Sequence, residues 1–337
     1  MTPSVVTIRD VAARAGVSIG TASRVLSGHP ATSPEARTRV TEAATAIGYR
    51  PNAQARSLRL TRTHTIGLLV SDVRNPFFAD VAHAAEQAAL DADYVTLLGN
   101  ANEDVEQQER YLETFQTQRV DGVLLTPQGR GSGTLEALIA SGMPVVFADR
   151  TIDGIDVPSV TTDSRSGLDQ AIAHLAAAGH ARIAFIGGPQ SISTGRDRHA
   201  AFVDALPRHG LTVHPELVTF GDFREASGFE ATERLLASPE RPTAILAADN
   251  LMAVGALTAI RRHHLTFGTD VELVAFDDLE WFAHVNPPLS AIAHDPGAIG
   301  SCAVELLLQV INGETPQSIL LPTRFIDRSA LGGGRDE

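Results

Sequence analysis

The chain has 337 residues, of which 43% are hydrophobic and 20% are charged, and it contains one cysteine, Cys302. Such a composition is typical of a globular protein with two or three compact units. A lone cysteine excludes an internal disulfide and a metal site built from several cysteines. The sequence has no apolar run of about 18 residues and no signal-peptide core, so we expect a cytoplasmic protein without a membrane partner.

Charge is distributed unevenly along the chain. Residues 1–62 contain nine arginines and three acidic residues, a net charge of +6, so the overall charge of −13 leaves −19 on the remainder. A small basic segment attached to a large acidic one indicates that only the first part meets nucleic acid or another acidic partner.

Three short helices are predicted within residues 7–48. Thr7, Ser18 and Ser33 are the expected N-caps, and Gly28 is the expected stop of the second helix. The apolar residues of three such helices are few, so we expect one small core.

The second helix carries little apolar surface. Four of its residues can face the small core: Val17, Ala22, Val25 and Leu26. Its other face is left with Ile19, Gly20, Thr21, Ser23, Arg24 and Ser27. A second helix after a tight glycine turn is the helix-turn-helix layout, in which this helix enters the DNA major groove. The alternative is a plain three-helix unit with a solvated face, which the +6 charge disfavours.

Residues 49–65 read "YRPNAQARSLRLTRTHT" and do not continue the third helix past Pro51. A short helix capped by Asn52 is too short and too polar to be stable alone, so we expect it to order only on a partner. Leu58 is an apolar residue flanked by arginines, which suits a wedge between DNA base steps. The alternative is that Leu58 packs on the acidic body.

From Thr65 onwards the pattern becomes α/β, with short β-rich runs separated by helices. The predicted strands are 65–70, 93–99, 122–126, 144–149, 181–188, 244–248, 271–276 and 290–294. The predicted helices are 77–90, 105–118, 164–178, 198–206, 228–236, 251–261 and 297–311. Alternation over about 270 residues predicts two lobes with parallel sheets. Ligands of such sheets bind beyond the carboxyl ends of the strands.

Several motifs together resemble the lactose/galactose repressor family of bacterial transcription regulators. They include "VTIRDVAARAGVSIGTASRVLSG", "GYRPNAQARSLR", "TIGLLVSDVRNPFF", "AADNLMAVGAL" and "VAFDD", and the resemblance covers essentially the whole chain. It implies a helix-turn-helix domain over 1–50, a hinge helix and linker over 51–63, and an effector-binding and dimerisation body over 64–337. The body would resemble periplasmic binding proteins, with lobe 1 at about 64–162 and 292–323 and lobe 2 at about 163–291 and 324–337.

The resemblance also implies roles in DNA binding for individual residues. Base-reading positions fall on Ile19, Gly20 and Arg24, and Gly20 departs from the polar residue often found there. Phosphate-contacting positions fall on Thr7, Ser18, Thr21, Ser23 and Ser33. Minor-groove positions of the hinge fall on Asn52, Ala55, Leu58 and Arg59.

Effector-binding positions implied by the resemblance fall on Asn75, Phe77, Phe78, Asp149, Arg198, Phe223, Asp249 and Asp277. Carboxylates accept hydrogen bonds from vicinal hydroxyls and aromatic rings cover the C–H face of a sugar, so this set suits a polyhydroxylated ligand. The set also allows nucleobases and sugar acids, and Arg198 could equally pair with a carboxylate or phosphate. Individually, these residues could instead form strand-end turns or salt bridges between lobes.

Enzyme motifs are weak in this sequence. "GGPQSISTGR" resembles a phosphate-binding loop only loosely, and neither G-K-[ST] nor G-x-S-x-G is present. The resemblance implies a homodimeric, sugar-responsive repressor of carbohydrate-utilisation genes that binds a near-palindromic operator. We expect no enzymatic activity, cofactor or metal site, and a location on the nucleoid when DNA is bound. The alternatives are a sugar-binding module or a sugar-modifying enzyme.

Overall fold

The computed structural model describes residues 6–26, 31–49 and 62–329. The chain divides into two compact units, Met1–Thr63 and His64–Glu337, which are described separately. The expected helix stop at Gly28 and the expected hinge residues Asn52, Ala55, Leu58 and Arg59 lie outside the described residues.

The first unit contains the three expected helices, α1 (Ile8–Ala15), α2 (Ile19–Leu26) and α3 (Pro34–Ala46). The Asp10 carboxylate accepts from the backbone N–H and the hydroxyl of Thr7, at 2.8 and 2.7 Å. Ser18 Oγ accepts from the Thr21 N–H at 3.1 Å and Ser33 Oγ from the Ala36 N–H at 3.2 Å, which confirms both predicted caps.

A small apolar core holds these helices together. It is built from Val11, Ala12, Ala15, Ala22, Val40, Ala43 and Ala44. Val17, Val25 and Leu26 pack against it, which confirms the predicted inner face of α2. The turn between α1 and α2 requires Gly16, whose φ is +64°, because a side chain is disfavoured in this left-handed conformation.

The second unit contains two six-stranded sheets, and we call each sheet with its helices a lobe. Lobe 1 has the strand order β11-β5-β4-β3-β1-β2, all parallel. Its strands are β1 (Thr65–Val70), β2 (Val95–Asn100), β3 (Gly122–Leu125), β4 (Val145–Ala148), β5 (Ser159–Asp163) and β11 (Ile319–Pro322). Its helices are α5 (Pro76–Asp91), α6 (Val105–Gln118), α7 (Gly133–Ala140) and α12 (Pro296–Ile311).

Lobe 2 repeats this arrangement with the order β12-β10-β9-β8-β6-β7, in which β12 alone is antiparallel. Its strands are β6 (Ile183–Gly187), β7 (Val218–Phe220), β8 (Ala244–Ala247), β9 (Glu272–Phe276), β10 (Ser290–Ala293) and β12 (Arg324–Ile326). Its helices are α8 (Ser164–Ala177), α9 (Ser193–Arg208), α10 (Glu225–Leu236) and α11 (Asn250–Arg262), with short 3-10 turns at Pro215–Leu217 and Glu280–Ala283. The expected two-lobed α/β class is confirmed.

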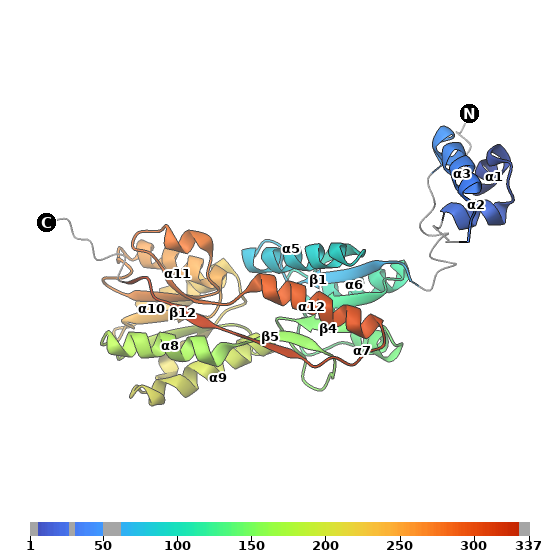
Figure 1. Cartoon of the computed structure of the whole chain (residues 1–337). Helices are drawn as coiled ribbons and strands as arrows, with labels where there is room; N and C mark the ends of the chain where they lie inside the picture. Colours follow the sequence, from blue (N-terminus) through green and yellow to red (C-terminus); the bar gives the residue numbers. More distant parts are fainter. Residues whose placement is uncertain (1–5, 27–30, 50–61, 330–337) are drawn as a thin grey trace. The chain divides into compact units, whose positions relative to one another are not determined.

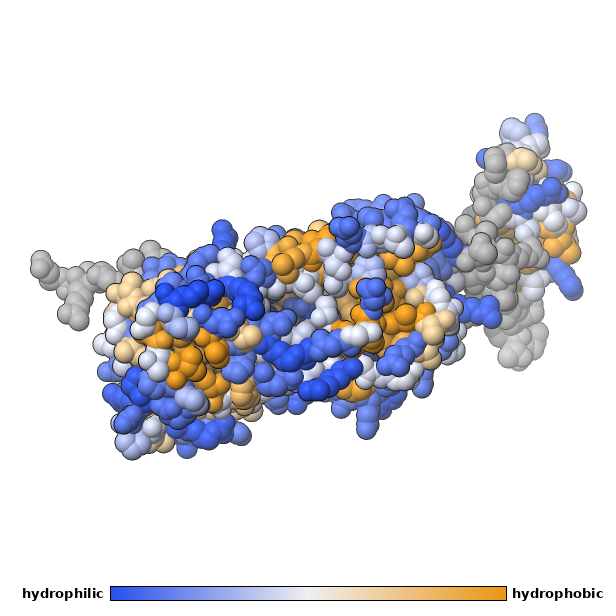
Figure 2. All heavy atoms as spheres, turned by 90° about the horizontal axis from the view of Figure 1, so that it is seen from below, coloured by the Kyte–Doolittle hydropathy of each residue, from blue (hydrophilic) through white to orange (hydrophobic). Residues whose placement is uncertain are grey.

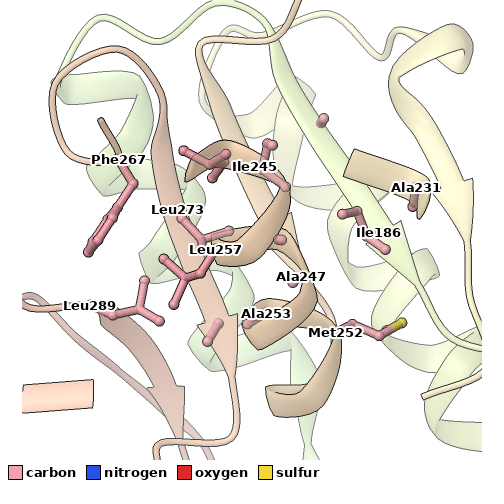
Figure 3. Close-up of a cluster of buried hydrophobic side chains, with 14 of the residues drawn as sticks. Ile186, Ala231, Ile245, Ala247, Met252, Ala253, Leu257, Phe267, Leu273 and Leu289 are labelled. Atoms are coloured by element: carbon pink, nitrogen blue, oxygen red, sulfur yellow. The ribbon is translucent and has the colours of Figure 1, made fainter. Parts of the chain in front are cut away.

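Helices cover both faces of each sheet. In lobe 1, α5 and α12 lie side by side although they are about 200 residues apart in the sequence (Figure 1). In lobe 2, α10 and α11 close a core that includes Ile186, Ile245, Met252, Leu257 and Leu273 (Figure 3). Because the strands are buried on both faces, they read as continuous apolar runs, which is why most of them were predictable.

The chain crosses between the lobes three times, after β5, after β10 and after β11. Thr323, at the third crossing, is buried and joins the first crossing. Its Oγ1 accepts from the Gly167 N–H at 2.9 Å and donates to the Asp163 carbonyl. The first and third crossings are therefore hydrogen-bonded to each other.

Some predicted boundaries were wrong and some elements were not predicted. Helix α9 begins at Ser193 and ends at Arg208, whereas 198–206 was expected. Its first turn is polar and glycine-containing and its last holds Pro207, so apolar periodicity marked only its middle. The elements without a prediction were α7, β5, β7, β11 and β12, of which three are short edge strands with partly exposed residues. In the described part of the chain, no helix combines the length and apolarity needed to span a bilayer.

Candidate functional site

The outer face of α2 presents the predicted base-reading residues to solvent. Ile19 is 46% exposed, and Gly20 and Arg24 are also exposed. Arg24 Nε donates to the Gly20 carbonyl at 3.3 Å, so the guanidinium lies along the helix. An exposed isoleucine beside glycine and arginine offers apolar contact and a bidentate donor to base edges.

The predicted phosphate-contacting residues lie at the starts of the helices. Thr7 precedes α1, Ser18 and Thr21 share a hydrogen bond of 2.9 Å at the start of α2, and Ser33 precedes α3. Ser23 is partly exposed on α2. Helix starts expose backbone N–H groups and a partial positive charge, which suit phosphate oxygens.

The body brings all eight predicted effector residues to one pocket between the lobes. Most of these residues follow strands, because the carboxyl ends of both parallel sheets face this pocket. The complete lining is Asn75, Phe77, Phe78, Asp149, Arg150, Thr194, Arg198, Phe223, Asp249 and Asp277. About 10 Å³ is left free among these side chains, which is room for about one water molecule, so a larger ligand requires the lining side chains or the two lobes to move apart.

Aromatic rings form the apolar walls of the pocket. Phe77 and Phe78, in the first turn of α5, meet edge to face with centroids 4.8 Å apart. Phe223 comes from lobe 2 and lies against Gly188, where a Cβ atom would be 2.0 Å from its ring. Gly188 therefore lets the Phe223 ring reach the pocket.

A buried ion pair, Glu103 with Arg150, forms the lobe 1 wall. The Arg150 guanidinium donates to both carboxylate oxygens of Glu103 at 2.8 Å, and to Ser71 Oγ and Gln128 Oε1 at 3.0 Å. It also lies 5.3 Å from the Phe223 ring centroid. Arg150 is thus fixed in the pocket with most of its donors already used.

A second charged cluster, around Arg198 and Asp277, forms the lobe 2 wall. Arg198 Nη1 donates to the Ala248 carbonyl at 2.8 Å and Nη2 lies 3.6 Å from Asp277 Oδ1. The guanidinium covers the Phe276 ring at 3.7 Å. His294 Nε2 is 2.7 Å from the same Asp277 oxygen.

Direct contacts join the two lobes across the pocket. Asn75 caps α5 and its Oδ1 accepts from Asn250 Nδ2 at 2.8 Å, while its Nδ2 donates to Asp249 Oδ2 at 3.5 Å. The ring of Phe77 stacks on that of His294 with centroids 4.8 Å apart. The pocket is consequently built only when both lobes contribute.

Burial and charge shift the carboxyl pKa values in opposite directions. Burial, helped by the nearby Asp277 charge, raises the pKa of Asp249 to about 8. Burial also raises the pKa of Asp149, although Arg198 and Arg150 partly offset it. For Asp277, burial is outweighed by Arg198 and His294, so its pKa lies below the ordinary value. At neutral pH the pocket therefore holds both a protonated and an ionised carboxyl group.

Several buried polar atoms around the pocket lack a hydrogen-bond partner among the described residues. They are Asp149 Oδ1, Arg150 Nε, Arg198 Nε, Asn250 Oδ1 and His294 Nδ1. An unsatisfied buried polar group lowers the free energy of unfolding by roughly 1–3 kcal/mol. A cluster of such groups therefore indicates a functional role for the region. A polar ligand with hydroxyl groups would supply both donors and acceptors to them.

Backbone strain gathers at the same place. Glu103, Asp149, Phe223 and Asp277 all have φ between 56° and 66°, in the left-handed region. Each such residue costs on the order of 1 kcal/mol or more and persists only where the surroundings fix it. Three of these residues, Asp149, Phe223 and Asp277, line the pocket, and Glu103 bonds to Arg150, which also lines it.

Four residues of this region were not among the predicted site residues. Arg150 and Thr194 line the pocket, and Glu103 and His294 bond to residues that line it. Arg150 is the second residue after β4 and His294 directly follows β10, so the expectation that ligands bind beyond strand ends points to both, whereas Glu103 is placed by tertiary contact alone. The described residues contain no cluster of three side chains able to hold a metal ion.

Two known families match the chain. Residues 7–52 match the family described as "Bacterial regulatory proteins, lacI family". Residues 63–329 match the family described as "Periplasmic binding proteins and sugar binding domain of LacI family". The two matches correspond to the helical unit and to the two-lobed body.

Similar proteins share this organisation over nearly their full length. Catabolite control protein A of Priestia megaterium is 33% identical over 323 residues, which are 95% of this chain and 97% of the relative. The ribose operon repressor of Escherichia coli (strain K12) is 33% identical over 313 residues, 92% of this chain and 94% of the relative. The lac repressor dimer bound to operator and the anti-inducer ONPF has a TM-score of 0.85 at 29% identity, over 96% of this chain and 98% of that one.

Proposed function

This chain belongs to the LacI family of bacterial regulatory proteins, and we propose that it represses carbohydrate-utilisation genes under the control of a small sugar-like effector. The observation that carries the effector half of this proposal is the convergence of all eight predicted effector residues on one pocket between the lobes. The ribose operon repressor and the lac repressor, to which this chain is similar, support the regulatory half.

We assign DNA recognition to the first unit. Residues 1–50 form the DNA-binding domain, in which Ile19, Gly20 and Arg24 read bases from the major groove. The phosphate contacts are Thr7, Ser18, Thr21, Ser23 and Ser33. The hinge at 51–63 contributes minor-groove contacts through Asn52, Ala55, Leu58 and Arg59. The exposure of the α2 face and the basic charge of residues 1–62 support this assignment.

The body at 64–337 is assigned to effector binding and dimerisation, with lobe 1 at about 64–162 and 292–323 and lobe 2 at about 163–291 and 324–337. Apolar surface for a second copy is present. Val95 and Leu98, on the edge strand β2, are 64% and 50% exposed, and Leu90 at the end of α5 is 54% exposed. Figure 2 shows apolar patches on the surface of the body. An exposed apolar sheet edge favours pairing with another chain.

The effector is assigned to Asn75, Phe77, Phe78, Asp149, Arg198, Phe223, Asp249 and Asp277. Since both lobes supply these residues, a bound effector would change the free energy of lobe closure and thereby the affinity for operator DNA. We place the protein in the bacterial cytoplasm, on the nucleoid when DNA is bound, and assign it no enzymatic role.

Operator binding with and without effector tests this function. The operator is first identified as the genomic DNA fragment that the full-length protein binds selectively. Fluorescence anisotropy then measures the affinity for this operator in the presence of each sugar of a panel. We expect one sugar to change the affinity at least tenfold, in either direction.

The Phe223→Ala variant should keep operator binding and lose the response to that sugar. The matched control is Phe220→Ala, which removes an exposed ring from β7 and should keep the response. A protein that selects no DNA sequence contradicts the proposal.

A further inference from the structure

We propose that Glu103 sets the charge selectivity of the effector pocket, by neutralising Arg150, so that the pocket accepts uncharged monosaccharides and rejects their acid and phosphate derivatives. This inference rests on the proposed function of the pocket as an effector site. The residue types in the pocket do not distinguish neutral from anionic ligands, since an arginine in a sugar pocket could equally bind an anion. The pairing of Arg150 with Glu103 does distinguish them.

The first argument is the pairing of both guanidinium groups. Arg150 is bidentate to Glu103 at 2.8 Å and lies 3.6 Å from Asp149. Arg198 lies 3.6 Å from Asp277 and donates to the Ala248 carbonyl. Among the described residues around the pocket, each guanidinium therefore already faces a carboxylate of this chain.

The second argument is the surplus of carboxyl groups. Four carboxyl groups, from Glu103, Asp149, Asp249 and Asp277, surround two guanidinium groups and the imidazole of His294. Glu103 and Asp277 already balance the two guanidinium groups. A carboxylate or phosphate on the effector would therefore bring a buried negative charge without a free cationic partner, and its repulsion by these carboxylates is strong at low dielectric. Hydroxyl groups can instead bond to the unpartnered Asp149 Oδ1 and Arg198 Nε without adding charge.

The third argument concerns the starts of α5 and α11, two helix starts that face the pocket and would otherwise attract anions. The start of α9, where Thr194 lines the pocket, has no side-chain cap. Asn75 Oδ1 accepts from the Phe77 N–H at 3.0 Å at the start of α5. Asp249 Oδ1 accepts from the Met252 N–H at 2.9 Å at the start of α11. Both starts are thus capped by the chain itself. Arg196, in the first turn of α9, is paired with Asp153 at 2.9 Å.

The geometry of Glu103 indicates that its position is specific. Its φ is +56°, its backbone N–H donates to the Ser71 carbonyl at 3.2 Å, and its carboxylate is almost fully buried against Arg150. Glu103 does not line the pocket itself, so it acts through Arg150 and is a specificity-determining residue.

Calorimetry on the full-length protein tests this inference with matched ligands. The neutral probes are the common D-aldopentoses, D-aldohexoses and D-ketoses, and the anionic probes are D-glucuronate, D-galacturonate, D-gluconate, D-ribose 5-phosphate and D-glucose 6-phosphate. We expect at least one neutral probe to bind and every anionic probe to bind at least a hundredfold more weakly.

The Glu103→Gln variant should raise the affinity for anionic probes relative to neutral ones by about tenfold or more, because Arg150 is then unpaired. The matched control, Glu106→Gln, makes the same change at an exposed position on α6 and should keep the original preference. The double variant with Glu103→Gln and Arg150→Gln removes both charges and should also reject anions. Thermal melting verifies that each variant is folded.

Tight binding of an anionic probe to the unmodified protein overturns the inference and leaves the proposed function standing. Unchanged selectivity in folded Glu103→Gln overturns the role of Glu103. If no neutral probe binds while operator binding persists, the ligand class is wrong but the regulatory function remains. Loss of both effector and operator binding would remove the proposed function itself.

Discussion

Arg24 on α2 and Arg198 on α9 are both arginines assigned to ligand contacts, yet they lie in opposite surroundings. Arg24 is exposed on α2, in a three-helix unit whose core consists of seven valine and alanine residues. Arg198 is 4% exposed, covers the ring of Phe276 and faces Asp277. An exposed residue that contacts DNA can therefore be substituted without affecting the fold. A buried pocket residue, in contrast, contributes both to ligand binding and to stability.

The largest expected effect is the loss of stability when the buried Arg198 is replaced. Arg198→Ala should lower the free energy of unfolding of the body by about 3–5 kcal/mol, because it leaves Asp277 buried without its guanidinium partner. Chemical denaturation measures this change. The double variant Arg198→Met with Asp277→Asn should recover most of the stability but no effector binding. A loss below about 1 kcal/mol for the single variant would contradict the buried-pair argument.

A pH dependence of stability should also come from the pocket. The pKa of Asp249 is raised to about 8 in the folded protein, well above that of an exposed aspartate. The folded state therefore retains a proton that the unfolded chain releases, and stability declines between about pH 4 and pH 8, by at most about 1.4 kcal/mol per pH unit. Denaturation across this range checks the slope. Asp249→Asn, which can still cap α11, should flatten it, and an identical slope in both proteins would refute this source.

A substitution that adds volume beside Phe223 tests the geometry of the pocket without changing its charge. Gly188→Ala places a Cβ atom within 2.0 Å of the Phe223 ring, so we expect a loss of about 1–3 kcal/mol in stability and weaker effector binding. Thermal melting and calorimetry measure the two effects. Gly133→Ala is the matched control, because its added Cβ meets nothing within 4 Å. Equal behaviour of the two variants would show that Phe223 adapts freely.

The smallest effect on stability is expected for the exposed Arg24. Arg24→Ala should leave the free energy of unfolding within about 0.5 kcal/mol of its original value, and cost about 1–3 kcal/mol of operator binding. Anisotropy against the operator and against single-base variants measures the second effect. Arg24→Lys keeps the charge but not the bidentate geometry, so it should still lose base specificity. Equal weakening on all sequences would make Arg24 a phosphate contact.

The sequence by itself determined the three-helix unit and the α/β class of the body, and its resemblance to a known family implied eight of the residues that line the pocket. The first two features rest on local signals, namely the caps at Ser18 and Ser33 and the continuous apolar strands. Each signal lies within a few residues of the feature that it predicts, so no knowledge of distant contacts is required.

Only the tertiary structure decided which charges meet in the pocket. Glu103 lies 47 residues from Arg150 in the sequence, and Asn75 lies 175 residues from Asn250, yet each pair is hydrogen-bonded. The edge strands β11 and β12 likewise take their places through long-range pairing. Such pairings depend on strand order and lobe closure, and the net charge around Arg150 and Arg198 follows from them and not from residue type.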